Sequence, residues 1–259
     1  MLRKIIAIAN QKGGVGKTTT AVNLSASLAA AEKKILLIDM DPQANASSGL
    51  GYRSEDIEAS LYEAITESAP LSDVIKQTDI PYLELVPSNI NLVGCELELV
   101  NLPSREHYLK KILEPIKKDY DYIFIDCPPS LGLLTLNALT AADGVIIPLQ
   151  TEYYAMEGIN RLLNTIKHVK NKLNPNLVIT GILLTMYDSR LNLAKQIVED
   201  VKKFFTDLVY QTVIYRNITL CEAPSHGKPV LLYDAVSKGA ENYMSLAREM
   251  LSDEIQTTR

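Results

Sequence analysis

Two lysines stand within one glycine-rich stretch, NQKGGVGKTTT at residues 10–20, and this pattern predicts a loop that binds phosphate. Glycines allow the backbone to approach an anion closely and to adopt positive φ angles. The helix expected to follow would present free N–H groups and a partial positive charge to the same anion. In this pattern Lys17 contacts the β- and γ-phosphates and Thr18 ligates Mg²⁺. The expected phosphate-binding residues are Gly13, Gly14, Val15, Gly16, Lys17, Thr18 and Thr19.

Three aspartates follow apolar, strand-like runs and could serve a metal ion and a water molecule. Asp126 ends the run YIFID, where a carboxylate that holds Mg²⁺ is expected beside such a loop. Asp39 and Asp41 are two residues apart, so in an extended segment their side chains point the same way. We expect Asp39 and Asp126 to support the metal beside Thr18, and we expect Asp41 to orient the attacking water. The alternatives are a cap or turn at Asp126 and a turn at Asp41-Pro42.

A sheet must position these residues, since apolar runs of strand length alternate with helical patterns along the chain. Continuous apolar runs suit strands buried on both faces of a parallel sheet. The alternation predicts the α/β class, with one doubly wound, mostly parallel sheet, helices on both faces, and a single domain over residues 1–259. In such sheets ligands bind beyond the carboxyl ends of the strands, where all three motifs fall. We expect strands at 3–9, 35–39, 82–86, 121–126, 144–149, 177–185 and 208–214, and helices at 18–31, 56–66, 91–100, 105–118, 131–141, 156–173, 190–205 and 237–252.

Composition narrows the class of protein. The net charge of −5 means that any affinity for DNA must come from a local basic patch. Neither a signal peptide nor an apolar run long enough to span a bilayer is expected. The three cysteines, at 95, 127 and 221, form no CxxC pair, so a disulfide framework or a cysteine metal site is not expected. A reducing cytoplasm fits this cysteine usage.

Four motifs in order, KGGVGKTT, DMDPQAN, DCPPSLG and EAPSHGKP, resemble those of the ParA/MinD group of deviant Walker A ATPases, and above all the chromosomal Soj-type ParA proteins. The resemblance covers nearly the full chain. It implies a P-loop fold, ATP and Mg²⁺ as ligands, and slow hydrolysis unless a partner stimulates it. Gln11 stands where the general P-loop pattern has glycine, which is usual in the Soj-like branch.

The resemblance explains the first of the two lysines. Lys12 matches the signature lysine that crosses a dimer interface to the partner subunit's nucleotide, so ATP would hold two subunits face to face. Lys12 is therefore expected to act in catalysis with Lys17 and Asp41, and to contact ATP. The alternative is a solvated loop lysine.

The resemblance also implies where the base and DNA bind. Family members place the equivalent of residues 215–217 beside adenine, so Tyr215, which replaces the usual proline, and Asn217 are expected to contact it; GTP remains an alternative. Soj-like proteins bind DNA through basic residues on the C-terminal side. Thr219 stands where the family has a second such arginine. The corresponding DNA-binding candidates are Arg190, Lys195, Lys202, Lys203 and Arg216, and the alternative for the lysines is an ordinary solvated helix face.

The same resemblance implies that the protein partitions chromosomes or plasmids. It also implies a cytoplasmic location, in association with the nucleoid. An ATP-dependent homodimer would bind double-stranded DNA without sequence preference, and a ParB/Spo0J-type centromere-binding protein would trigger hydrolysis. A MinD-like membrane role would require a basic amphipathic C-terminal helix, and the polar tail MLSDEIQTTR does not fit one. Cluster-carrying relatives need a cysteine pair that Cys127 does not complete. A nucleotide-binding regulator with little turnover is a further alternative.

Overall fold

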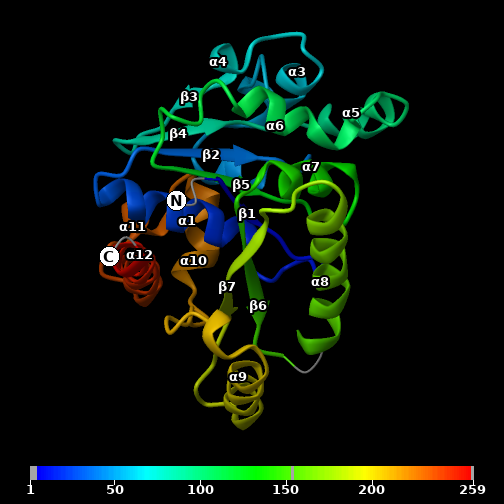
Figure 1. Ribbon diagram of the computed structural model, residues 1–259. Coiled ribbons are helices and arrows are strands. Elements are labelled where there is room, and N and C mark those ends of the chain that lie inside the picture. Colours follow the sequence, from blue (N-terminus) through cyan, green and yellow to red (C-terminus); the bar gives the residue numbers. More distant parts are fainter. Residues whose placement is uncertain (1–4, 153–154, 258–259) are drawn as a thin grey trace.

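One seven-stranded sheet forms the centre of the molecule (Figure 1). The computed structural model describes residues 5–152 and 155–257. The strand order is β3-β4-β2-β5-β1-β6-β7, and every neighbouring pair is parallel except the antiparallel edge pair β3-β4. The predicted α/β fold with a mostly parallel sheet is therefore confirmed. The strands are β1 (Ile5–Ile8), β2 (Ile35–Asp39), β3 (Lys76–Gln77), β4 (Leu83–Val86), β5 (Tyr122–Asp126), β6 (Gly144–Gln150) and β7 (Val178–Thr185).

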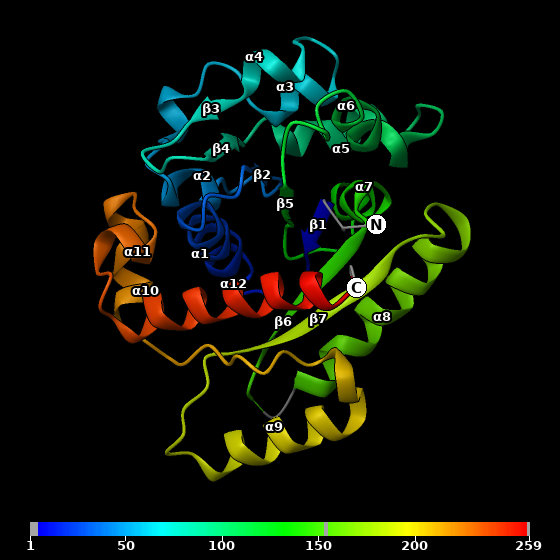
Figure 2. The same cartoon turned by 60° about the vertical axis from the view of Figure 1, so that its left-hand side comes forward.

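Helices cover both faces of the sheet because its central strands are apolar on both sides. Alternate residues of β1 enter different cores: Ile5 and Ala7 belong to one, and Ile6 and Ile8 to the other. The first core also contains residues of α3, α5, α6, α7, α8 and α9, and the second contains residues of α1, α2 and α12. Figure 2 shows α12 lying along α1 on the second face.

The helices vary widely in length. In the described part of the chain no helix has both the length and the apolar character that crossing a membrane requires. Much of the polar C-terminal tail lies outside the described side chains, so the expectation about it stays a prediction. The helices are α1 (Lys17–Ala30), α2 (Asn45–Gly49), α3 (Leu61–Ile65), α4 (Leu71–Val74), α5 (Leu92–Leu99), α6 (Tyr108–Leu113), α7 (Leu133–Ala141), α8 (Ala155–Lys172), α9 (Asn192–Phe205), α10 (Thr219–Glu222), α11 (Val230–Tyr233) and α12 (Lys238–Thr257).

The strand expected at 208–214 is wrong. This segment runs beside β7 and is joined to it by an isolated bridge at Ile182 and by two backbone hydrogen bonds, from the Tyr210 N–H to the Ile182 carbonyl (3.0 Å) and from the Ile214 N–H to the Leu184 carbonyl (2.9 Å), without forming a continuous strand ladder. The Glu249 carboxylate of α12 accepts hydrogen bonds from the backbone N–H groups of Gln211 (2.6 Å) and Thr212 (2.9 Å). Those two N–H groups are thus bonded to a side chain instead of a strand ladder. A contact with a residue so distant in the sequence leaves no trace in the local apolar pattern.

The helix expected at 56–66 is shorter than predicted and spans only Leu61–Ile65. Ser60 and Glu63 form a capping box. The Ser60 side chain accepts a hydrogen bond from a backbone N–H of the first turn, and the Glu63 side chain accepts one from the Ser60 N–H. This cap fixes the first turn at residue 61. Five short elements, β3, α2, α4, α10 and α11, were not predicted at all, because none has enough residues to show a period.

Candidate nucleotide and metal site

The glycine-rich loop joins β1 to α1 at the carboxyl edge of the sheet. Gly14 and Gly16 have φ angles of 70° and 86°, so a side chain at either position would strain the backbone. Helix α1 begins immediately after, at Lys17, and the sequence places no acidic residue in its first turn. The N-terminal N–H groups of a long helix are therefore directed into a loop built to accept an anion.

Side chains on both sides of the loop fix its position. The Thr185 hydroxyl, at the end of β7, donates a hydrogen bond to the Val15 carbonyl (2.9 Å). The Gln11 amide donates to the Gly158 carbonyl of α8 (3.1 Å). Gln11, which replaces the glycine of the general pattern, thus anchors the loop to a helix that lies far away in the sequence.

Lys17 is a buried cation that lacks a carboxylate hydrogen-bond partner in the described structure. Its ammonium group donates to the Lys12 carbonyl (3.1 Å), and the side chain is only 6% exposed. Burial lowers the pKa of Lys17, while the carboxylates of Asp126 and Asp41 act in the opposite direction. An anion placed in the loop would stabilise the charged form of this lysine.

Two aspartates lie side by side beneath the loop. Asp39 ends β2 and Asp126 ends β5, and the two are paired in register across the sheet. Asp39 accepts hydrogen bonds from the Ser47 N–H (2.8 Å), the Ser47 hydroxyl (2.7 Å) and the Asp41 N–H (3.2 Å). Both carboxylate oxygens of Asp126 are buried without a hydrogen-bond partner of good geometry. An orphaned buried carboxyl calls for an explanation, and a cation is one.

The pKa values of the pair reflect this burial. Burial, and then the neighbouring Asp39 carboxyl, raise the pKa of Asp126 well above its usual range, while the nearby Thr18 hydroxyl acts in the opposite direction. Burial likewise raises the pKa of Asp39 to about 6. No cluster of three or more His, Cys, Asp or Glu side chains with metal-binding geometry occurs in the ranges that the structure describes. The oxygen donors of Asp126, Asp39 and Thr18 suit a hard ion such as Mg²⁺, which keeps waters and takes phosphate oxygens as further ligands.

These shifts predict how the stability of the ligand-free protein depends on pH. Between the ordinary Asp pKa of 3.8 and the folded value of about 6, the native state binds more protons at Asp39 than the unfolded state does. Stability must therefore fall as pH rises through this window, by an amount on the order of 2–3 kcal/mol from Asp39. Thermal unfolding from pH 4.5 to 7.5 should show a shallower fall in Asp39→Asn than in the unsubstituted protein. Identical pH profiles for the two proteins would contradict the prediction.

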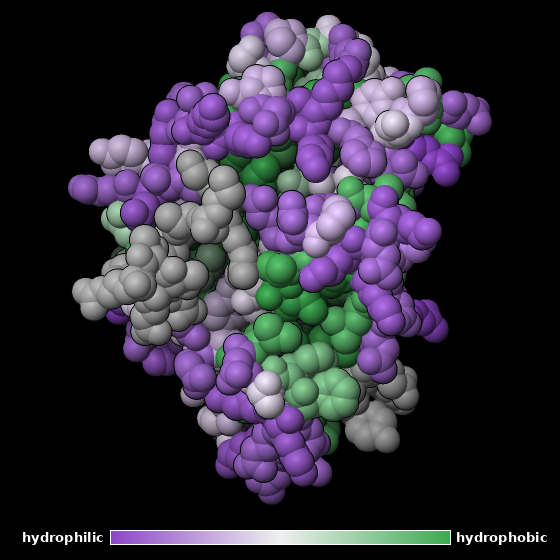
Figure 3. All heavy atoms as spheres, in the orientation of Figure 1, coloured by the Kyte–Doolittle hydropathy of each residue, from purple (hydrophilic) through white to green (hydrophobic). Residues whose placement is uncertain are grey.

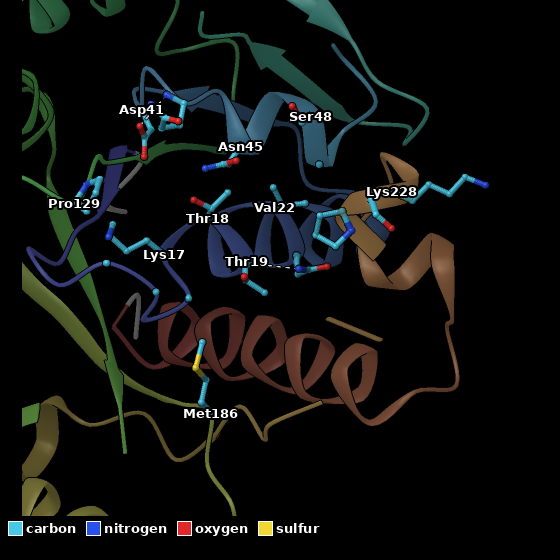
Figure 4. Close-up of a pocket in the computed structure, with 18 residues that line it drawn as sticks. Lys17, Thr18, Thr19, Val22, Asp41, Asn45, Ser48, Pro129, Met186 and Lys228 are labelled. Atoms are coloured by element: carbon cyan, nitrogen blue, oxygen red, sulfur yellow. Dashed lines mark hydrogen bonds between the residues drawn. The ribbon is translucent and has the colours of Figure 1, made fainter. Parts of the chain in front are cut away.

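A cavity of about 600 Å³ opens above these residues (Figure 4). Lys17, Asp41 and Pro129 lie at one end of it, and Lys228 lies at the other. Asp41 is held in place because its carboxylate accepts a hydrogen bond from the Gln43 N–H (3.0 Å). Several residues that line the cavity were not predicted from the sequence as site residues. They come from three separate segments and are Gln43, Asn45, Ser48, Met186, Pro224, Ser225 and Lys228.

One buried side chain explains why the C-terminal motif reaches this cavity. Asn23 of α1 donates to the Thr19 carbonyl (2.8 Å) and accepts from the Val230 N–H (2.7 Å). It thereby fastens the segment EAPSHGKP, at 222–229, to the helix that follows the phosphate loop. The motif itself was visible in the sequence, but its distance from the loop was not.

Lys12 does not line its own cavity. Its ammonium group pairs with Glu152 at 3.4 Å, and both side chains are partly exposed. Glu152 also lies 4.0 Å from the guanidinium group of Arg216. Lys12, the first lysine of the motif, is thus held away from the cavity in an ion pair that exposure to water keeps weak.

Tyr215 and Asn217, the candidates for adenine, also lie outside the residues that line the cavity. The Tyr215 ring meets Tyr187 edge-on, with 5.2 Å between ring centroids. The Asn217 side chain accepts hydrogen bonds from the N–H (2.8 Å) and the hydroxyl of Thr219. Thr219, which stands where the family has an arginine, therefore occupies the side-chain oxygen of Asn217, one of the two polar atoms that would read a base edge.

The basic candidates lie on and near α9, which projects from the body of the molecule (Figure 1). Arg190 is held by Asp188 through two side-chain hydrogen bonds of 2.9 and 2.7 Å. This guanidinium group lowers the pKa of Asp188 to about 2. Glu199 and Asp200 stand between Lys195 and the lysine pair at 202 and 203, so the helix has a mixed charge.

Comparison with known proteins gives a consistent result. Residues 3–179 match a family model described as an AAA domain. The sporulation initiation inhibitor protein Soj of Bacillus subtilis is 57% identical over 250 residues, which cover 96% of this chain and 99% of that protein. The chromosome partitioning protein ParA of Myxococcus xanthus is 55% identical over 248 residues, covering 96% and 88%. The structure of cobyrinic acid a,c-diamide synthase from Mycobacterium smegmatis, with an ATP analogue and magnesium bound, superposes with a TM-score of 0.86 at 36% identity, covering 99% of this chain and 97% of that one.

Proposed function

The chain belongs to the ParA/MinD family of deviant Walker A ATPases, in its Soj-type branch, and from this premise we propose that it partitions chromosomes or plasmids by an ATP-dependent switch. The observation that carries the proposal is the buried Lys17 beside the orphaned carboxyl of Asp126, beneath a cavity of about 600 Å³. A triphosphate with its metal supplies the negative and positive charges that these two side chains lack. Relatives with ADP or an ATP analogue and magnesium bound support ATP and Mg²⁺ as the ligands.

Each residue then has a role that follows from its position. Lys17 and the backbone N–H groups of the loop bind the phosphates. Thr18, Asp126 and Asp39 would hold Mg²⁺, which would offset phosphate charge when bound. Asp41 lines the cavity near Lys17, where its carboxylate can orient the attacking water.

The switch is proposed to depend on a second subunit. Among the residues that the structure describes, Lys12 does not line the cavity of its own chain, and its ammonium group pairs with one exposed carboxylate. In the proposed ATP-bound dimer it exchanges Glu152 for the nucleotide of the partner subunit. Hydrolysis removes the γ-phosphate and with it the charge that favours the dimer, so the subunits separate.

The dimer is proposed to bind DNA nonspecifically through the α9 region of both subunits and to be reset by a ParB-type partner. Dimerisation doubles the number of basic side chains that face one duplex. Because α9 also carries acidic residues, one subunit alone presents a weak patch. This arrangement favours DNA binding that depends on the nucleotide state.

Phosphate release should be measured with ATP and Mg²⁺ alone, with double-stranded DNA, and with DNA plus the centromere-binding partner. We expect slow release with ATP alone and the fastest release when both additions are present. The Lys17→Ala variant, which lacks the buried cation, gives the background rate. Equal release under all three conditions would instead support a nucleotide-binding regulator with little turnover.

DNA affinity gives a separate prediction about Arg190. Each cation that contacts a phosphate contributes about 1 to the slope of log affinity against log salt concentration. Arg190→Ala should therefore lower the slope by about 2 for the ATP-bound dimer. Asp188→Asn, which releases the guanidinium group from its carboxylate, should strengthen binding. Retardation assays between 50 and 200 mM salt test both, and an unchanged slope in Arg190→Ala would remove this residue from the DNA surface.

A further inference from the structure

The solvent side of α5 has an apolar surface that the described structure leaves uncovered. Val93 and Leu97 lie on α5, and Ile90 and Val100 flank its two ends; the spacing of three, four and three residues is that of one helix face. All four are exposed, Leu97 by 76%. We refer to these four residues as the α5 stripe. Hydrophobic residues appear at the upper right edge of the molecule in Figure 3, where Figure 1 places α5.

Two hydrogen bonds connect the α5 region to the nucleotide site. The Ser47 hydroxyl, which donates to Asp39, accepts from the Ser88 N–H (3.0 Å) just before the helix. Glu96 of α5 accepts from the Leu134 N–H (3.3 Å) at the start of α7. The segments that follow both buried aspartates therefore contact the element that bears the stripe, and a rearrangement of either would reach it.

The acidic residues of α5 do not interrupt the stripe. Glu96 is bonded to Leu134, and Glu98 accepts a hydrogen bond from the Tyr62 hydroxyl (2.8 Å). Each lies on a flank of the helix and is held by a donor of its own chain. The uncharged surface between them suits another apolar surface better than a basic peptide. A two-fold symmetric contact brings the same patch of both subunits together, so an apolar patch is complementary to itself.

The area of the stripe fits a contact that needs the nucleotide. From the exposed fractions of its four residues, the stripe presents roughly 400 Å², which is within the range of the largest apolar patch on a typical monomer, and such a patch is often functional. A stable interface buries about 800 Å² per partner, so the stripe supplies about half. Because each subunit carries a net charge of −5, the two also repel one another. The remaining stabilisation must come from the mouth of the nucleotide cavity.

We infer that the α5 stripe packs against a second copy of this chain in the ATP-bound dimer. The inference rests on the proposed function, because it assigns the apolar part of the same nucleotide-dependent interface. It adds Ile90, Val93, Leu97 and Val100 to the trans-acting lysine as the determinants of association.

Sedimentation velocity with Mg²⁺ and a non-hydrolysable ATP analogue tests the inference. Leu97→Glu places one charge in each stripe and should raise the dimer Kd by about 30-fold or more. Leu97→Met should restore association, since it is apolar and similar in volume. A fluorescent nucleotide should bind the Leu97→Glu monomer normally, because Leu97 lines no part of the cavity.

Val236→Glu is the matched control, because Val236 is 95% exposed and lies between α11 and α12, away from α5. It should leave the dimer unchanged. Equal dimerisation of Leu97→Glu and the unsubstituted protein would overturn the inference while the proposed function stood. Loss only of stimulation by the partner protein, with dimers intact, would also overturn it in favour of a docking site for that partner. Failure of the unsubstituted protein to dimerise would overturn the proposed function and the inference together.

Discussion

Lys12→Ala is expected to abolish the ATP-dependent dimer while the monomer still binds nucleotide. Two opposite unit charges about 4 Å apart attract by ~4 kcal/mol at an effective dielectric near 20. Losing that contact should raise the dimer Kd by ~10³-fold per site, and each dimer has two sites. The monomer is spared because Lys17 bonds the carbonyl of residue 12, which alanine retains. Light scattering with ATP measures the dimer, and a fluorescent nucleotide measures binding to the monomer.

Asp41→Ala, a substitution in the nucleotide cavity, should have the opposite effect on the ATP-dependent dimer. It removes the carboxylate proposed to orient water but keeps both lysines, so ATP-bound dimers should accumulate. Glu152→Gln is a further control, because it removes the counter-ion of Lys12 in the monomer and should not weaken the dimer. A Lys12→Ala dimer of normal stability would disprove the trans role of this lysine.

Asp126→Ala should stabilise the ligand-free fold and, at the same time, remove the response to Mg²⁺. A buried polar group without partners costs about 1–3 kcal/mol, and neither oxygen of this carboxyl has a hydrogen-bond partner of good geometry. The space left by the carboxyl offsets part of the gain. A net gain of about 1 kcal/mol would raise Tm by about 2–4 °C in a chain of this length. Mg²⁺ with nucleotide should then give little further stabilisation.

Scanning calorimetry with and without Mg²⁺ and nucleotide measures both effects of Asp126→Ala. Asp41→Ala is the matched control for stability, because its carboxylate accepts a hydrogen bond from Gln43 and its loss should bring no gain. An Asp126→Ala protein that unfolds at a lower temperature and still responds fully to Mg²⁺ would show that this carboxyl has a structural role instead.

The sequence predicts the core of this molecule well, because its signals are local. Gly14 and Gly16 occur where the loop needs positive φ angles, and Asp39 and Asp126 end apolar runs that become adjacent central strands. Parallel strands bring their carboxyl ends to one edge, so the convergence of the motifs follows from the strand pattern alone.

The features that the sequence did not predict depend on distant partners. Glu249 binds the N–H groups of Gln211 and Thr212 within the segment expected as a strand, and Glu152 pairs with Lys12 across more than half of the chain. Ser47 contacts Asp39 from the short helix α2, which begins after a positive φ angle at Ala44. A pattern of neighbouring residues records none of these contacts, since each depends on how separate elements pack.

The attachment of the last helix to the first has a consequence for synthesis on the ribosome. Thr20 of α1 shares a hydrogen bond of 3.2 Å with Tyr243 of α12, and Asn23 bonds the backbone at Val230. A nascent chain that ends before these residues lacks the C-terminal segments that pack against α1. Helix α1 can therefore complete its packing only late in translation, after the C-terminal segment has left the exit tunnel.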